Sequence, residues 1–136
     1  MTFEGYRKSE TITTKTTDVF LLDDWLLVIR FLDNDIEVDY NEVSDQIEAG
    51  KKLTGNKKAP VLVDVRESFH TLTTEAKELA ASEENKLAEA ILLKAFHQRL
   101  IATFFLKLSN QKNNHPVKIF TNQAEAIAWL KQFAPK

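Results

Sequence analysis

The chain has 136 residues, enough for one domain, and its hydrophobic (43%) and charged (28%) fractions are those of a folded protein and not of a disordered one. It contains no cysteine, which excludes disulfides, thiolate chemistry and cysteine-ligated zinc or iron–sulfur centres. A formal net charge of -2 argues against a general nucleic-acid-binding protein, because such domains are normally strongly basic.

The near-neutral total hides three segments of strong charge. Residues 25–50 contain one base and seven acids, residues 51–58 contain four lysines and no acid, and residues 94–118 contain five bases and no acid. A local charged or anionic partner is therefore compatible with the overall charge.

The chain shows no targeting pattern, repeat or low-complexity linker. The first ten residues are polar, unlike a signal peptide, and apolar runs such as residues 25–29 are far too short to span a membrane. We expect a cytoplasmic protein with one domain over residues 1–136, of which residues 1–10 are loosely ordered.

The first third of the chain predicts strands. Residues 19–22 and 25–32 flank Asp23 and Asp24, which are suited to a tight turn between antiparallel strands. The second run is almost continuously apolar, as in a strand covered on both faces. Residues 35–40 alternate apolar and acidic side chains, which predicts a half-buried edge strand with Ile36, Val38 and Tyr40 on its inner side.

Helices and strands alternate over the rest of the chain. A helix is expected over residues 41–53 with Gly55 near its end, followed by a strand over 61–65 that Pro60 opens. Thr73 or Thr74 can cap the next helix, which has Ala76, Leu79 and Ala80 along one side. A strand over residues 87–94 follows.

The last part of the chain repeats the same alternation. Residues 96–109 predict a helix with a broad apolar face, residues 110–115 a polar loop, and residues 117–120 a strand. Asn122 and Glu125 resemble a capping box that starts a final helix. That helix is expected to bury Ile127, Leu130 and either Trp129 or Phe133. Strands joined by helices imply right-handed crossovers, hence a mixed α/β sheet with an antiparallel N-terminal hairpin followed by parallel βα units.

Several residue strings, in this order and spacing, resemble a known superfamily. They are Asp24-Trp-Leu-Leu-Val, Pro60-Val-Leu-Val-Asp-Val-Arg, Thr74-Glu-Ala, Arg99-Leu-Ile-Ala-Thr-Phe-Phe-Leu, Pro116-Val-Lys-Ile-Phe-Thr and Glu125-Ala-Ile-Ala-Trp-Leu. The chain resembles the SpoIIAA-like superfamily, which groups STAS anti-sigma-factor antagonist domains with the Sec14 (CRAL-TRIO) lipid-binding fold. It is most similar in organisation to small stand-alone bacterial STAS/SEC14 domain proteins. The resemblance covers about residues 20–133 and implies a single SpoIIAA-like domain with helices packed on the sheet.

The resemblance also directs attention to the start of the second helix. In anti-sigma-factor antagonists an Asp-Ser-Ser-Gly sequence opens this helix, and phosphorylation of one serine switches partner binding. The matching positions here are Leu72, Thr73, Thr74 and Glu75, so two hydroxyls are kept while the aspartate and glycine are not. The alternative interpretation of Thr73 is an ordinary N-cap.

The densest set of polar side chains lies in residues 64–74, after a predicted parallel strand and before a helix, where open α/β sheets usually bind ligands. The candidate partner- or ligand-binding residues are Asp64, Arg66, Ser68, His70, Thr71, Thr73, Thr74 and, on the 96–109 helix, Arg99. The alternative is structural: Arg66 pairs with Asp64 or Glu67, and His70 is an exposed loop residue.

Other chemistry is disfavoured by the pattern. The three histidines lack metal-ligand spacing, and a calcium-loop reading of residues 33–44 places valine and serine where glycine and glutamate are needed. No nucleophile elbow or glycine-rich phosphate loop occurs. We therefore expect neither metal nor cofactor.

Three functions remain as hypotheses. The preferred one is a non-enzymatic regulatory or interaction module that binds a protein partner, or itself as a homodimer, through the 66–74 loop. The second is a carrier or sensor of a small apolar or anionic, lipid-like ligand that uses this loop and the 96–109 helix. The third is an enzyme with Asp64 and His70 in acid–base roles.

Overall fold

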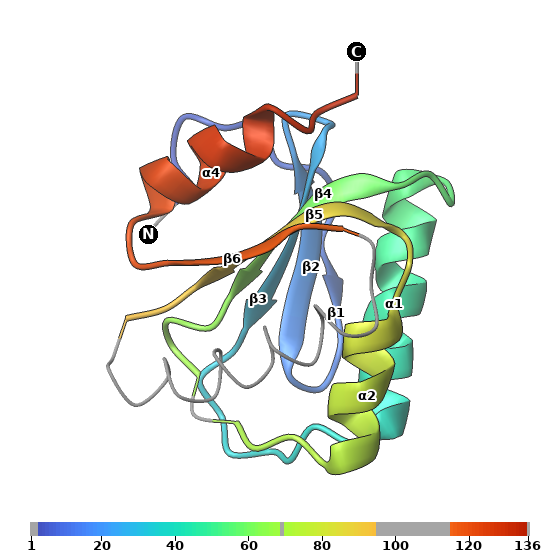
Figure 1. The fold of residues 1–136 in the computed structure, drawn as a ribbon. Coiled ribbons are helices and arrows are strands. Elements are labelled where there is room, and N and C mark those ends of the chain that lie inside the picture. The colour runs from blue at the N-terminus through green and yellow to red at the C-terminus, as the bar shows by residue number, and fades with distance from the viewer. Residues whose placement is uncertain (1–2, 69, 95–114, 136) are drawn as a thin grey trace.

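The fold is a mixed α/β sheet with helices on both faces (Figure 1). The structure is a computed structural model that describes residues 3–68, 70–94 and 115–135. Within these residues the sheet has six strands in the order of the chain: β1 (Ile12–Thr13), β2 (Thr17–Leu22), β3 (Leu26–Phe31), β4 (Ala59–Asp64), β5 (Lys86–Leu92) and β6 (Val117–Phe120). The first three strands pair antiparallel and β3 to β6 pair parallel. The predicted mixed sheet with an antiparallel start is confirmed.

Helices α1 (Tyr40–Thr54) and α2 (Thr74–Ser82) cover one face of the sheet, and α4 (Gln123–Lys131) covers the other (Figure 1). Side chains of β3 alternate between these layers, because Leu26 and Val28 pack with Leu130 of α4 while Leu27 packs with Ala49 of α1. The continuous apolar run of β3 thus reflects a strand buried on both faces, as predicted.

The turns and helix caps between these elements are formed by the predicted residues. Asp23 and Asp24 have φ values of 49° and 64°, as a tight hairpin turn between β2 and β3 requires. Gly55 ends α1 at φ 64°, and its N–H donates to Lys51 O. The Asn122 side chain accepts the Glu125 N–H at 2.9 Å and starts α4, in which Ile127 and Leu130 are buried.

The predicted edge strand over residues 35–40 is wrong. Only Val38 forms a bridge, parallel to Leu72, and Ile36 and Tyr40 are 44% and 52% exposed. The physical reason is that the Asp39 carboxylate accepts the Glu42 N–H at 2.9 Å and caps α1. The helix therefore begins at Tyr40, and residues 35–40 do not pair as a strand of the sheet despite their alternating pattern. The acids of this stretch lie in a loop and not on a sheet edge.

Residues 1–10 were expected to be loosely ordered, but their described part is partly bonded to β2. The Ser9 N–H donates to Leu21 O at 3.0 Å, and the Asp23 N–H donates to Arg7 O at 2.8 Å. The segment thus runs beside the hairpin. The predicted helix over 96–109, with Arg99, and the loop over 110–114 lie outside the described residues.

A buried carboxylate fastens the β1–β2 turn to α1. Glu42 is 3% exposed, and its Oε2 accepts from Thr14 Oγ1 at 2.6 Å, Thr16 N at 2.9 Å and Gln46 Nε2 at 3.2 Å. Burial by itself raises the pKa of Glu42, but the hydrogen bonds from Thr14, Thr16 and Gln46 together outweigh burial and hold this pKa below its ordinary value. Because the pKa is lowered on folding, the ionised carboxylate stabilises the fold at neutral pH.

We predict that Glu42→Gln lowers the free energy of unfolding by roughly 1–3 kcal/mol at pH 7, because an amide cannot accept all of these bonds. Wild-type Glu42 is fully ionised above the ordinary glutamate pKa of about 4.3 and loses its stabilising charge as the pH falls through its lower folded pKa. The difference between variant and wild type should therefore shrink in acid. Urea unfolding at pH 7 and at low pH measures it, with the exposed Glu48→Gln on the same helix as the control. A difference that grows in acid would contradict the assignment.

Candidate functional site

The candidate loop, residues 65–73, leaves the carboxyl end of β4 and lies beside the loop over residues 32–39 that joins β3 to α1 (Figure 1). The Val38 N–H donates to Thr71 O at 2.9 Å, and the Thr73 N–H donates to Val38 O at 3.0 Å. Since β3 and β4 are parallel neighbours, both loops emerge at the same edge and supply hydrogen-bond partners to each other.

Asp64 and Arg66 form a two-pronged ion pair at the end of β4. Asp64 is 3% exposed; Arg66 Nε donates to its Oδ1 at 3.0 Å and Nη2 to its Oδ2 at 2.8 Å. The Arg66 Nη2 also donates to Oε1 of Gln123 in α4 at 2.9 Å. The hydrogen bonds to Asp64 raise the pKa of Arg66 above its ordinary value. The structural interpretation of this pair is confirmed, and the pair ties the loop to the opposite helix layer.

His70 is enclosed between the two loops. The residue is 6% exposed, its Nδ1 lies 2.7 Å from Ile36 O and its Nε2 lies 2.8 Å from Leu32 O. The prediction that His70 is an exposed loop residue is wrong, because its ring packs between the two loops, with each nitrogen within hydrogen-bonding distance of a backbone carbonyl.

The serine and threonine residues of the candidate loop are of two kinds: some accept hydrogen bonds from the backbone, and others are exposed to solvent. The buried Ser68 accepts the His70 N–H on its Oγ at 3.2 Å. Thr73 accepts the Ala76 N–H at 3.1 Å and is the N-cap of α2, which confirms the ordinary capping interpretation. Thr71 and Thr74 are exposed.

The candidate residues therefore lie close together, but most of them bond to one another or to neighbouring elements of the fold. Asp64, Arg66, Ser68 and His70 make internal bonds, and Thr71 and Thr74 face outward; Arg99 lies outside the described residues. Sequence reasoning missed Gln123, which is 57 positions from Arg66, and the carbonyls of residues 32 and 36. No local pattern marks them, because each contact is made between distant parts of the chain.

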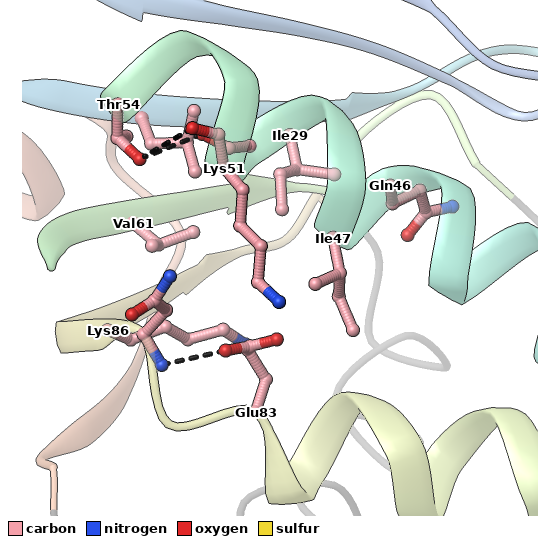
Figure 2. A pocket seen from close by; sticks show the side chains of 11 residues that line it. Ile29, Gln46, Ile47, Lys51, Thr54, Val61, Glu83 and Lys86 are labelled. Atoms are coloured by element: carbon pink, nitrogen blue, oxygen red, sulfur yellow. Dashed lines mark hydrogen bonds between the residues drawn. The ribbon is translucent and has the colours of Figure 1, made fainter. Parts of the chain in front are cut away.

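A small apolar cavity of about 40 Å³ lies elsewhere, between α1, the sheet and the start of β5. Figure 2 shows that Ile29, Ile47 and Val61 line it and that the Lys51 side chain extends across it toward Glu83 and Lys86. A cavity of this size has room for one or two water molecules. It has no room for a lipid chain.

A buried carboxylate on β5 is held by a lysine and a histidine. Glu89 is 1% exposed; its Oε1 lies 3.1 Å from Lys86 Nζ and 3.4 Å from His115 Nε2. Burial raises the pKa of Glu89, but the charge and hydrogen bonds of Lys86 and His115 outweigh this and lower it below the ordinary value. Glu89 thus has its own partners and is not a free acid or base.

Two further findings concern the described part of the chain. It holds no group of three or more histidine, aspartate or glutamate side chains that could bind a metal ion. None of its helices is long and apolar enough to cross a membrane.

Comparison with known proteins identifies the family and the fold. The family model described as "Domain of unknown function (DUF7793)" matches residues 20–134, so the chain belongs to this family. Among solved structures, the chain is similar to an uncharacterised protein of the DUF3478 family with a SpoIIAA-like fold from Shewanella loihica PV-4. The TM-score is 0.56 at 14% sequence identity, over 96% of this chain and 98% of the other. This likeness shows the predicted SpoIIAA-like fold. None of the curated proteins compared with the chain matches it.

We predict that Arg66→Lys lowers the free energy of unfolding by about 1–3 kcal/mol, because an ammonium group cannot make the paired contacts to Asp64 and also reach Gln123. Arg7→Lys is the matched control: Arg7 pairs with Asp24 at the surface and should cost less than roughly 0.5 kcal/mol. Urea unfolding followed by circular dichroism compares the two. Equal costs would contradict a structural role for the Arg66 pair.

We predict that Thr73→Ala destabilises the protein by about 1 kcal/mol because it removes the N-cap of α2. Thr74→Ala, one residue into the helix and exposed, should change stability by less than roughly 0.5 kcal/mol. Thermal or urea unfolding of both variants tests this. A reversal of the two effects would overturn the capping assignment.

Proposed function

We propose, from the membership of this chain in the DUF7793 family and from its SpoIIAA-like fold, that it is a non-enzymatic, cytoplasmic regulatory module of STAS-like type. It binds a protein partner through the outer surface of residues 66–74 and the start of α2. The observation that carries this proposal is the closure of the loop: its buried polar side chains are bonded to each other and to neighbouring elements.

A closed loop of this kind suits surface recognition. The ion pair of Asp64 and Arg66 and the two bonds of His70 hold the backbone in one conformation, so little conformational freedom is lost when a partner docks. The exposed side chains of Glu67, Thr71, Thr74 and Glu75 then stand on a fixed frame.

The two other hypotheses receive less support. The carrier hypothesis relies on residues 96–109, which lie outside the described residues, and the cavity that the described part of the chain forms between α1 and the sheet measures only about 40 Å³. Acid–base catalysis needs Asp64 and His70 to be available to a substrate, but Asp64 is bound by Arg66 and His70 by two carbonyls. The loop lacks the open polar centre that such chemistry requires.

We predict that a photo-crosslinking amino acid placed at Thr71 or Thr74 in living cells captures a protein partner, because both side chains project from the loop. Glu48, which is exposed on the outer side of α1, provides the control position. Crosslinked products are identified by mass spectrometry. The same partner captured from Thr71 and Thr74 and not from Glu48 supports the proposal. Identical capture from all three positions, or from none, would refute it.

Native mass spectrometry of the purified protein separates the carrier hypothesis from this one. The expected result is the mass of the chain alone under non-denaturing conditions. A stoichiometric small molecule that co-purifies and is released by denaturation would replace the interaction proposal with the carrier.

A further inference from the structure

The geometry points to the chemistry of the partner: a protein segment that carries basic side chains around an apolar anchor. This inference rests on the proposed function and deepens it. The surface concerned, here called the acidic–apolar patch, is defined by Ile36 and Tyr40 together with the acids Asp33, Asp35, Glu37, Glu67 and Glu75.

The apolar part of the patch is unusual for this molecule. Ile36 and Tyr40 are the large hydrophobic side chains that stand exposed among the described residues, at 44% and 52%. A partner that covers Ile36 and Tyr40 removes their remaining apolar surface from water, which favours binding. Exposed apolar side chains that stand together in one short segment therefore mark a contact surface better than scattered ones.

The segment that carries these two side chains is firmly held. Val38 lies between them, is fully buried, and exchanges backbone hydrogen bonds with Thr71 and Thr73. The Ile36 carbonyl oxygen lies 2.7 Å from Nδ1 of His70. The patch thus joins the 66–74 loop laterally, and its backbone is already ordered before a partner arrives.

The polar part of the patch is strongly acidic. Residues 33–39 contain four acids and no base, and residues 67–78 contain three acids and one base, Lys77. Arg66 and Arg30, which lie nearby in sequence, are paired with Asp64 and Asp18. Next to the patch, Asn34 Nδ2 donates to the backbone carbonyl of Lys15 at 3.2 Å, a contact that does not involve the Lys15 ammonium group.

Helix dipoles account for only some of these acids. Asp39 caps α1 and Glu75 stands in the first turn of α2, where negative charge is favourable. Asp33, Asp35 and Glu37 precede α1 and are neither its N-cap nor part of its first turn. Among the described residues no base forms an ion pair with these three carboxylates, and their charge next to Ile36 complements a partner with lysine or arginine flanking an apolar side chain.

A separate partner fits this surface better than a second copy of the chain. The basic residues 51–58 are at the other end of α1, which is 15 residues and thus about 22 Å long. Residues 51–58 would bring lysines to the patch but no exposed large hydrophobic side chain to pack on Ile36 and Tyr40. We therefore assign the patch to a different protein, which supplies both basic and apolar side chains.

A random 12-residue peptide library displayed on phage tests the assignment without knowledge of the partner. Wild-type protein is the bait, and a parallel selection on Ile36→Ala/Tyr40→Ala measures the enrichment that does not depend on these two side chains. Enriched peptides are synthesised and titrated by calorimetry at two salt concentrations. We expect them to combine lysine or arginine with an aliphatic or aromatic residue. Their affinity should fall at least tenfold for Ile36→Ala/Tyr40→Ala and several-fold at the higher salt concentration.

Charge reversal supplies the matched comparison. Asp35→Lys/Glu37→Lys should weaken binding at least tenfold, whereas Glu48→Lys/Glu84→Lys, which changes the net charge equally at exposed positions outside the patch, should leave it within twofold. Circular dichroism and urea unfolding confirm that each variant is folded before its affinity is compared.

The outcomes separate this inference from the proposed function. Suppose that the enriched peptides are poor in lysine and arginine, and that Thr71→Arg weakens their binding while Asp35→Lys/Glu37→Lys does not. This result would overturn the inference of a basic partner and retain the proposed function of the 66–74 surface. Peptides insensitive to every one of these variants, or no enrichment over the double alanine variant, would overturn both. Self-association that sedimentation detects in wild type and not in Asp35→Lys/Glu37→Lys would assign the patch to a second copy and overturn the inference.

Discussion

The hydrogen-bonded junction between residues 32–39 and residues 65–73 governs the shape of the candidate surface. Both loops leave the carboxyl ends of neighbouring parallel strands, where backbone groups no longer have sheet partners. Val38 continues the pairing for one residue through Thr71 and Thr73, and the ring of His70 lies between the carbonyls of residues 32 and 36, within 2.8 Å of each. The chain thereby closes a position at which many α/β proteins keep an open crevice.

The ion pair of Asp64 and Arg66 adds a second constraint of a different kind. A buried pair contributes little net stability, because desolvation of both charges offsets much of their attraction. Its value here is geometric: the planar guanidinium reaches two carboxylate oxygens and Gln123 at once. The loop on one side of β4 is thus positioned relative to α4, which packs on the opposite face of the sheet from α2.

The sequence predicted the elements whose signals are local. Asp23 and Asp24 mark the hairpin, Gly55 ends α1, and Thr73 and Asn122 cap their helices, because each acts on residues within four positions. The alternation over residues 35–40 misled the prediction, since one cap at Asp39 began a helix before a strand was formed. Gln123 and His70 bind groups more than 30 residues away, and spacing carries no information about such pairs. The sequence therefore predicted the position of the loop at the end of β4, but not its closed state.

Closure of the loop changes the role inferred for its polar residues. Side chains that looked like a binding centre in the sequence bond to the backbone and to each other, so the recognition proposed above falls to the residues that the closed backbone displays. The misread alternation of residues 35–40 is part of the same argument. Ile36 and Tyr40 have no sheet to bury them, and the capped helix start and the Val38 bridge keep both of them at the surface. The exposed apolar surface of this pair is unfavourably hydrated until a partner covers it, and the acids beside it attract basic groups, so this edge of the molecule is where a complementary basic surface would gain most.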